Sequence, residues 1–233
     1  MFGLMKGKKA GLLVDEETSI TDVRYVVVDT ELTGLDEKKD SIVSIGAVRM
    51  VGGAIDIGNT FYRLVSPEKK LTAESVVIHE IMPSEVAEKP AIDTVLAEFL
   101  EFCGDAVLVG HFASIDLAFL DREMKRVFGR KVANPAVDTF SAYEWLRKRL
   151  RAHPCFSPPV RRYKLYDIVK CFGIPVNGAH NAVMDAFITA QLFQRMIPML
   201  VEAGAQDIGD LLKIGVPFEG GESVRQSGES SNF

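Results

Sequence analysis

Residues 27–34 read VVDTELTG, and this stretch decides how the chain folds. The valines at 26–28 predict a buried strand, and two carboxylates follow directly, at Asp29 and Glu31. Side chains two residues apart on a strand point to the same face of the sheet. We therefore expect Asp29 and Glu31 to lie side by side at the end of a central strand. On the tripeptide alone, a strand that simply ends in an acidic turn is an equally good interpretation.

Strand-like runs and helical spacing follow this stretch along the chain. Two of the runs, joined by a glycine pair at 52–53, predict a hairpin. Ser114 is expected to cap one of the helices. The order of the predicted strands and helices along the chain indicates an α/β fold with a mixed sheet, antiparallel at its start and parallel later, flanked by helices. The expected strands are residues 24–29, 41–51, 54–65, 106–110 and 132–138, and the expected helices are 90–103, 114–128, 139–151, 165–172 and 181–201.

The composition is that of one sizeable globular domain with an ordinary core, since 47% of the 233 residues are hydrophobic and 25% are charged. We predict a domain at residues 23–215, with a polar extension at 1–22 before it. A flexible tail rich in glycine, serine and glutamate is expected at 216–233. No apolar run approaches the ~18–20 residues that span a bilayer. The start of the chain lacks the apolar stretch of a secretory signal.

Cysteine usage and net charge narrow the class of protein further. The three cysteines are far apart and form no metal or redox motif, so we expect a reducing cytoplasm. A net charge of −5 argues against a general nucleic-acid coat protein, which would be basic. The same charge is compatible with a nuclease, because carboxylates that hold metal ions attract phosphate once the ions are bound.

Two further segments carry acids at helix starts. Asp116 is expected in the first turn of the helix at 114–128, directly after a short buried strand. Asp185 is expected early in the helix at 181–201, and His180 lies just before that helix. Each has an ordinary structural interpretation when taken alone. Acids are favoured in first turns by the helix dipole, and a histidine in this place is often a loop residue or a cap.

The combination of Asp29, Glu31, Asp116, Asp185 and His180 favours a site. Sheets of this class place their sites at strand ends and helix starts, where all of these residues are expected. Clustered carboxylates repel one another, and their pKa values rise unless cations compensate. Such oxygen ligands suit Mg²⁺ or Mn²⁺ rather than zinc. The set therefore predicts hydrolysis of a phosphodiester with divalent metal ions.

These residues resemble the DEDDh exonucleases, the DnaQ-like 3′–5′ exonuclease family that includes the proofreading subunit of bacterial replicative polymerases. Residues 29–31 (DTE) are similar to the family's Asp-x-Glu motif, and residues 180–186 (HNAVMDA) to its His-x-Ala-x-x-Asp-Ala motif. Asp116 and the FL pair at 119–120 are similar to the motif between them. The resemblance runs from about residue 24 to residue 199 and implies an RNase H-like five-stranded sheet.

The resemblance also implies how the residues divide the reaction. Asp29, Glu31 and Asp185 would hold the metal ion that carries the attacking water. Asp29 and Asp116 would help to hold the second ion, beside the leaving 3′ oxygen. His180 would take the proton of the water. The substrate would be a single-stranded 3′ end, and the products nucleoside 5′-monophosphates.

Five neighbouring positions are candidate substrate contacts. Leu32 stands where relatives place a residue against the terminal base, although a core or turn leucine fits equally well. His111 fits a structural histidine at least as well as a contact. Phe112 stands where many relatives have asparagine, which bears on substrate preference and leaves the metal ligands untouched. The candidates are Thr30, Leu32, Thr33, His111 and Phe112.

Basic side chains concentrate at residues 147–164. They could follow the backbone of a single strand, or they could form a solvated helix face and loop, which is the favoured interpretation. Tyr166 is one of several aromatics nearby that could stack on bases, although aromatics at helical spacing are more often core.

Three functions are therefore in competition. The first is a 3′–5′ exonuclease on single-stranded DNA, acting alone or with a DNA polymerase, for which no binding segment is recognisable. The second is an exonuclease of the same fold that acts on RNA. The third is a non-catalytic module that binds nucleic acid or a polymerase. The complete acid set together with His180 argues against the third.

Overall fold

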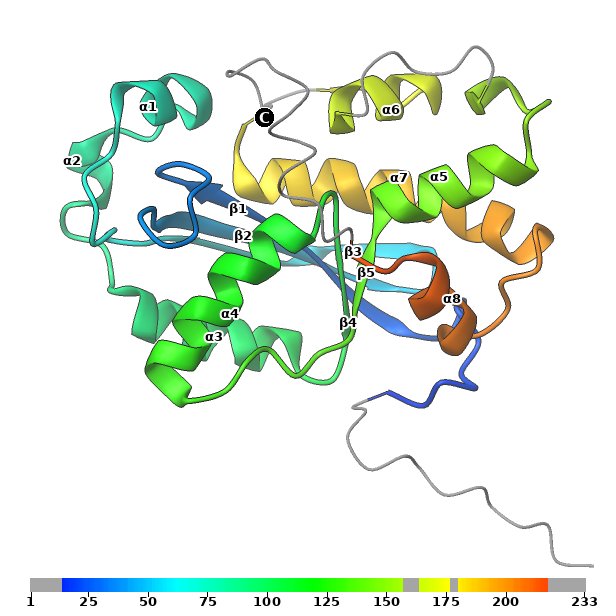
Figure 1. Ribbon diagram of the computed structural model, residues 1–233, viewed down its shortest axis with the longest axis horizontal. Helices are drawn as coiled ribbons and strands as arrows, with labels where there is room; N and C mark the ends of the chain where they lie inside the picture. Colours follow the sequence, from blue (N-terminus) through cyan, green and yellow to red (C-terminus); the bar gives the residue numbers. More distant parts are fainter. Residues whose placement is uncertain (1–13, 157–163, 177–179, 218–233) are drawn as a thin grey trace, which may run out of the picture.

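A five-stranded mixed sheet carries the fold, with helices on both of its faces (Figure 1). The computed structural model describes residues 14–156, 164–176 and 180–217. The strand order is β3-β2-β1-β4-β5, with β1, β2 and β3 antiparallel and β1, β4 and β5 parallel, as the sequence predicts. The strands are β1 (Arg24–Leu32), β2 (Ile42–Val51), β3 (Ala54–Leu64), β4 (Val107–Gly110) and β5 (Ala136–Asp138).

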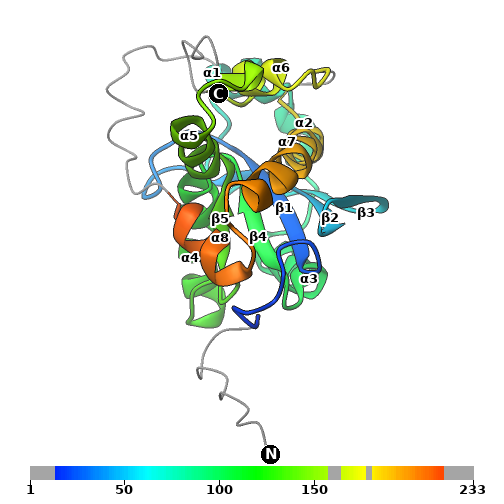
Figure 2. The ribbon, with the colours of Figure 1, turned by 90° about the vertical axis from the view of Figure 1, so that its right-hand side faces the viewer.

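Six of the eight helices in the described residues form two layers, one on each face of this sheet (Figure 2). The long helix α7 lies across β1 and β2 on one face, where α5, α6 and α8 also pack. Helices α3 and α4 cover the other face. The helices are α1 (Ala73–His79), α2 (Pro83–Val86), α3 (Ile92–Cys103), α4 (Ser114–Phe128), α5 (Thr139–Arg149), α6 (Leu165–Cys171), α7 (Ala182–Glu202) and α8 (Ile208–Ile214), with a 3-10 turn at Pro154–Phe156.

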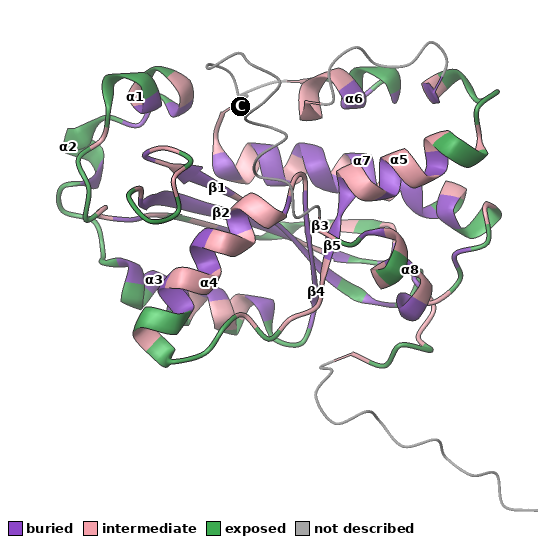
Figure 3. Cartoon of the chain, viewed as in Figure 1, coloured by how far each residue is buried: buried purple, intermediate pink, exposed green. Residues whose placement is uncertain are grey.

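Strand β1 is the centre of the sheet and is buried along most of its length (Figure 3), and its side chains contribute to both cores. Tyr25 and Val27 point into the core under α7, whereas Val26 and Val28 point into the core under α3 and α4. Each fully buried side chain of this size stabilises the fold by about 1.5–3 kcal/mol. The alternation has period two, so it also determines which face each residue after Val28 occupies.

Helix α7 approaches β2 closely at a glycine. A Cβ built on Gly46 would lie 2.1 Å from the backbone carbon of Ala182 and 2.2 Å from the backbone nitrogen of Val183. Only a residue without a side chain permits this contact. Because Gly46 pairs with Asp29 across the β1–β2 ladder, the close approach sets the first turn of α7 beside Asp29.

Several elements differ from the sequence predictions. Strand β1 continues to Leu32, because the ladder with β2 extends past Asp29 through a bulge between Glu31 and Leu32. Ser114 is the first helical residue of α4 and not its cap, a position taken by Ala113 without a side-chain hydrogen bond. The expected strand at 132–138 shrinks to β5, which begins after Pro135. Helices α1, α2 and α8 were not predicted at all.

Part of the expected N-terminal extension packs onto the domain. Ile20 is fully buried in the core under α7, and Ser19 bridges to Asp207. The division of the chain at residues 22 and 215 remains a prediction, since residues 1–13 and 218–233 lie outside the described residues. Across the ranges that the structure describes, no helix is both long enough and apolar enough to cross a membrane.

Candidate active site

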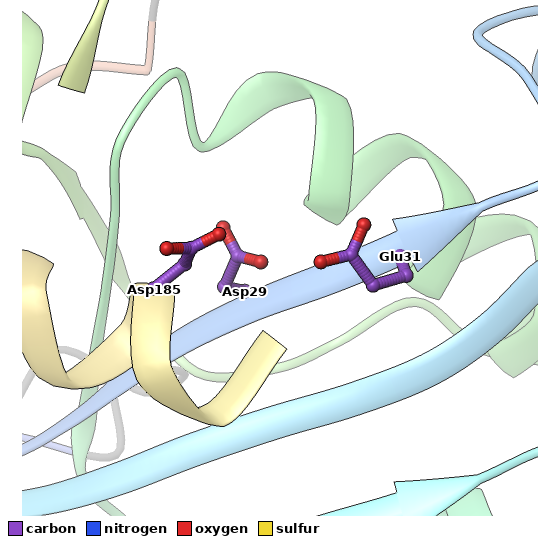
Figure 4. A group of neighbouring side chains, drawn as sticks. All are labelled: Asp29, Glu31 and Asp185. Atoms are coloured by element: carbon purple, nitrogen blue, oxygen red, sulfur yellow. The ribbon is translucent and has the colours of Figure 1, made fainter. Parts of the chain in front are cut away.

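Three carboxylates meet where β1 passes the start of α7 (Figure 4). Asp29 and Glu31 come from β1, on the face that Tyr25 and Val27 occupy, and Asp185 comes from the first turn of α7. One oxygen of each lies within 4.8 Å of the others. The same-face prediction for Asp29 and Glu31 is thus met by the geometry, and α7 adds the third acid.

Asp116 approaches the same strand from the opposite face. It lies in the first turn of α4, as predicted, and is 7% exposed. Its Oδ1 accepts hydrogen bonds from the Thr30 backbone N–H (2.9 Å) and the Thr30 hydroxyl (2.6 Å). Because Thr30 lies between Asp29 and Glu31, these bonds fix Asp116 to the middle of the acidic stretch. The four acids therefore straddle the end of β1.

Burial raises the pKa values of all four acids, and repulsion by the other acids raises those of Asp29 and Glu31 further. Burial raises the pKa of Asp29 well above its usual range, and the charges of Asp116, Glu31 and Asp185 raise it further. Burial, then Asp185 and Asp116, raises the pKa of Glu31 to about 8. Burial raises the pKa of Asp116 to about 7 against the lowering effect of the Thr30 hydrogen bonds. The pKa of Asp185 is also raised by burial.

Raised pKa values of this kind are the mark of a set of anions without compensating charge. Divalent cations would provide that charge, and carboxylate oxygens are the ligands that Mg²⁺ and Mn²⁺ prefer. The residues present therefore fit a divalent metal centre, with Asp29, Glu31 and Asp185 close enough to share one ion.

His180 stands beside this group in a constrained backbone conformation. Its φ is 63°, a left-handed value that costs a non-glycine residue about 1–3 kcal/mol. Its backbone N–H donates to Asp185 Oδ2 and to the Tyr166 hydroxyl, both at 3.0 Å. The ring of His180 packs edge-on against the ring of Tyr166, with centroids 5.3 Å apart.

Tyr166 is a contact that the sequence did not predict. Its hydroxyl donates toward both carboxylate oxygens of Asp185 at 2.8 Å. Burial raises the pKa of Tyr166 above its usual range, so the phenol stays protonated and available as a donor. Its only signal in the sequence was its place among the aromatics near the basic stretch, where stacking on bases and packing in the core were the interpretations considered.

A second strained turn lies on the α4 side of the site. Phe112 has a φ of 55°, and its backbone N–H donates to Asp138 Oδ1 at 3.1 Å. The same oxygen of Asp138 caps α5 through the N–H of Phe140. His111 Nδ1 lies 2.9 Å from the Thr139 hydroxyl, so His111 has the structural partner that the sequence left open. The turn after β4 is thereby fixed by the end of β5.

A pocket opens in front of the acids and gathers most of the predicted residues. Of the five candidate substrate contacts, Thr30, Leu32, His111 and Phe112 line it. Thr33 is not in its lining, and its buried hydroxyl donates to Asp40 instead. Leu32 also packs partly against the core under α3 and α4, as the core interpretation expects, and its contact with a terminal base stays a prediction. The lining residues that the sequence did not predict are Leu35, Ile115, Lys164, Leu165 and Tyr166.

The basic stretch at 147–164 is partly engaged in local contacts. Arg147 forms an ion pair with Glu144 one turn earlier, and the Arg149 guanidinium stacks over the ring of Trp145. These contacts agree with a helix face on α5. Arg161 and Arg162 lie outside the described residues.

Comparison with known proteins agrees with this geometry. The sequence pattern of the Exonuclease family (RNase_T) matches residues 26–193. The chain is 34% identical over 182 residues to the DNA polymerase III subunit epsilon of Aquifex aeolicus, covering 78% of this chain and 84% of that protein. It is 31% identical over 201 residues to the PolC-type DNA polymerase III of Thermotoga maritima, covering 86% of this chain and 14% of that much longer protein.

Solved structures show the same fold. Exonuclease X in complex with 5′-overhanging duplex DNA superposes with a TM-score of 0.58 at 26% identity, covering 82% of this chain and 98% of that one. Escherichia coli exonuclease I in complex with a dT13 oligonucleotide gives a TM-score of 0.67 at 17% identity, covering 78% of this chain and 42% of that one. The family pattern over most of the domain and the kinship with the epsilon subunit lead to one conclusion: this chain belongs to the exonuclease family, in its DnaQ-like branch.

Proposed function

We propose that this chain is a metal-dependent 3′–5′ exonuclease of the DEDDh type, which removes nucleoside 5′-monophosphates from single-stranded DNA ends. The observation that carries the proposal is the meeting of Asp29, Glu31 and Asp185 within 4.8 Å of one another. Asp116 and His180 lie directly beside this group. These five residues match the acid set and the histidine of the DEDDh pattern.

The chain's own residues would divide the work as follows. Asp29, Glu31 and Asp185 would hold one divalent ion, and Asp29 with Asp116 would help to hold a second. Two such ions, Mg²⁺ or Mn²⁺, supply an activated water and stabilise the charge on the leaving oxygen when bound. The imidazole of His180 would accept the proton of the water, a role that histidine side chains commonly take in catalysis.

The apolar side of the pocket would receive the terminal nucleotide. Leu32, Leu35, Ile115 and Phe112 supply flat or apolar surface beside the acids. Aromatic side chains stack on bases of any sequence, which suits an exonuclease that must degrade every sequence. Thr30 and His111 supply polar groups at the same pocket.

DNA is the proposed substrate, in association with replication. The relatives in Aquifex and Thermotoga are named as DNA polymerase III proteins, and exonuclease X was solved with DNA. A DNA polymerase is accordingly the proposed partner, and the cytoplasm the proposed location. RNA as a substrate is an outcome of the test below.

The test is a time course with single-stranded DNA and RNA of one sequence, each labelled at the 5′ end, in Mg²⁺, Mn²⁺ or EDTA. We expect a ladder that shortens from the 3′ end of DNA and disappears in EDTA. Asp29→Ala should abolish it, because the three-acid group loses its central member. Asp56→Ala, which removes an exposed carboxylate on β3, is the control, and this variant should cleave at the wild-type rate.

Each outcome distinguishes the competing functions. A ladder on RNA in place of DNA would assign the exoribonuclease. Cleavage by the Asp29→Ala variant at the wild-type rate would rule out the proposed metal-ion mechanism. Failure of folded, Mn²⁺-loaded protein to cut either strand would assign the non-catalytic module.

A further inference from the structure

We propose that Tyr166 is a positioning residue of this site, which sets Asp185 and His180 in their working orientation through its hydroxyl. The inference rests on the proposed function, because it assigns Asp185 to a metal ion and His180 to the water. It adds a sixth residue to the five that the DEDDh pattern contains.

The hydroxyl of Tyr166 has two partners that belong to the proposed chemistry. It donates toward both oxygens of Asp185, which restricts rotation of that carboxylate about its Cβ–Cγ bond. It accepts the backbone N–H of His180, the same N–H that reaches Asp185 Oδ2. The three groups therefore form a closed hydrogen-bonded ring of contacts.

This ring of contacts explains how His180 keeps a left-handed backbone. A positive φ persists in a non-glycine residue only where the surroundings hold it. The His180 N–H donates two hydrogen bonds, one of them to the Tyr166 hydroxyl, and these bonds supply such a hold. The ring of Tyr166 also borders the His180 imidazole edge-on, so that one side chain contacts both the backbone and the ring of His180.

The Tyr166 hydroxyl is not needed to anchor α6 to the domain. Ile168 and Val169 of the same helix are fully buried in the core under α7. Packing of these two side chains keeps the helix in place when the hydroxyl is removed. Groups that orient metal ligands through hydrogen bonds typically change metal affinity or activity by about 10–100-fold when they are lost.

The test compares Tyr166→Phe with Tyr25→Phe. Tyr166→Phe keeps the ring and removes the hydroxyl from the site. Tyr25→Phe removes a buried phenol hydrogen bond, to the Ile20 carbonyl at the far end of β1. For Tyr166→Phe we expect kcat to fall by roughly 10–100-fold with KM for DNA unchanged, and Mn²⁺ affinity, followed by electron paramagnetic resonance without DNA, to fall as well. Tyr25→Phe should lower Tm and leave kcat and Mn²⁺ affinity alone.

A double-mutant cycle with His180→Ala separates the two partners. If Tyr166 acts on the reaction through His180, Tyr166→Phe should lower kcat less in the His180→Ala background than in the wild type. Its effect on Mn²⁺ affinity, which passes through Asp185, should persist there. An equal fall of kcat in both backgrounds would overturn the part that runs through His180.

If Tyr166→Phe lowers Tm but leaves kcat and Mn²⁺ affinity unchanged, as expected for Tyr25→Phe, the proposal as a whole is overturned. Its failure is distinguishable from failure of the proposed function. A wild-type protein that binds Mn²⁺ more tightly than Tyr166→Phe but cuts no nucleic acid would keep the positioning role and remove the exonuclease. If the wild type is active and Tyr166→Phe has the same kcat and Mn²⁺ affinity, the exonuclease assignment stands and the positioning role is removed.

Discussion

At the scale of single residues, charge and hydrogen bonding divide the site into two parts. Asp29 and Glu31 are surrounded by other acids, and their pKa values are raised by burial and repulsion. Asp116 and Asp185 are also buried but accept hydrogen bonds, Asp116 from Thr30 and Asp185 from Tyr166 and His180. All four are proposed metal ligands, and hydrogen bonds orient the second pair in addition.

His180→Ala should lower the cleavage rate by roughly 10²–10⁴-fold, because the proposed proton acceptor is removed. Its backbone N–H remains, so the hydrogen bond to Asp185 remains and Mn²⁺ affinity should be unchanged. Single-turnover cleavage across pH 5.5–9 measures both the loss of rate and the change in the shape of the pH–rate profile. A pH–rate profile unchanged from the wild type would exclude His180 as the base. His153→Ala removes an exposed histidine and is the matched control.

Some residues of the site could be predicted from the sequence and others could not. The four acids could be predicted because strand ends and first helical turns have clear patterns, and the structure brings them to one place. Tyr166 could not be predicted in its contact with Asp185, because that contact depends on how α6 is set against α7. Thr33 directly follows the pocket residue Leu32 in the sequence. Its hydroxyl nevertheless donates to Asp40, because the chain bends there into a compact loop.

At the scale of elements, the position of α7 decides whether the acids meet. Asp185 reaches Asp29 only because the first turn of α7 lies directly against β2 at Gly46. Eight of the ten strands and helices predicted from the sequence agree with those observed to within two residues at each end, the exceptions being β1 and β5. The short helices α1, α2 and α8 are too short for a periodic pattern to be decisive, although α6, which is no longer than α1 or α8, was predicted.

Gly46→Ala should separate α7 from β2. The added Cβ would lie 2.1 Å from backbone atoms of Ala182, which cannot rotate away as a side chain could. Overpacking of this kind costs about 1–3 kcal/mol of stability or more. We expect a lower Tm, and a loss of cleavage in the protein that still folds, because Asp185 moves away from Asp29.

Gly53→Ala provides the control for this change. Gly53 lies in the turn between β2 and β3, and a Cβ added there meets no atom within 4 Å. Its Tm and rate should stay near those of the wild type. A Gly46→Ala variant as stable and as active as Gly53→Ala would show that the close approach does not set the site.

At the scale of the whole molecule, the site lowers the stability of the metal-free fold. The pKa of Glu31 is raised from 4.5 to about 8, and that of Asp116 from 3.8 to about 7. The folded chain therefore holds protons that the unfolded chain has released, and stability falls as pH rises through this range. In EDTA we expect Tm to decrease between pH 5 and pH 8.5, and Mn²⁺ to restore it at the alkaline end.

Glu31→Gln isolates the contribution of one acid to this slope. The substitution should flatten the decrease and raise the metal-free Tm at pH 8, by the equivalent of more than about 1 kcal/mol, since one pKa unit is worth about 1.4 kcal/mol. Glu98→Gln removes an exposed partner of Arg63 and should change little. A Tm in EDTA that is constant or rises between pH 5 and pH 8.5 in the wild type would contradict the raised pKa values.

The architecture of the molecule could be predicted from the sequence. The periodicity of apolar residues identified the strands and helices, and their order along the chain indicated how the sheet is built. The hairpin signal at residues 52–53 and the period-two valines of β1 together determine a sheet that begins antiparallel and has β1 at its centre. The depth of the pocket and its lining by Lys164 and Leu165 depend on how α6 packs, which no local pattern records.

The acids come from β1, α4 and α7, so the site has no complete form until the last of these helices has docked on the sheet. During synthesis the first two acids leave the ribosome long before Asp185 does. A nascent or truncated chain that ends before α7 would therefore carry the acids of β1 without their partner. Such a fragment would be harmless to the nucleic acids around it, and nuclease activity would begin only with a finished fold.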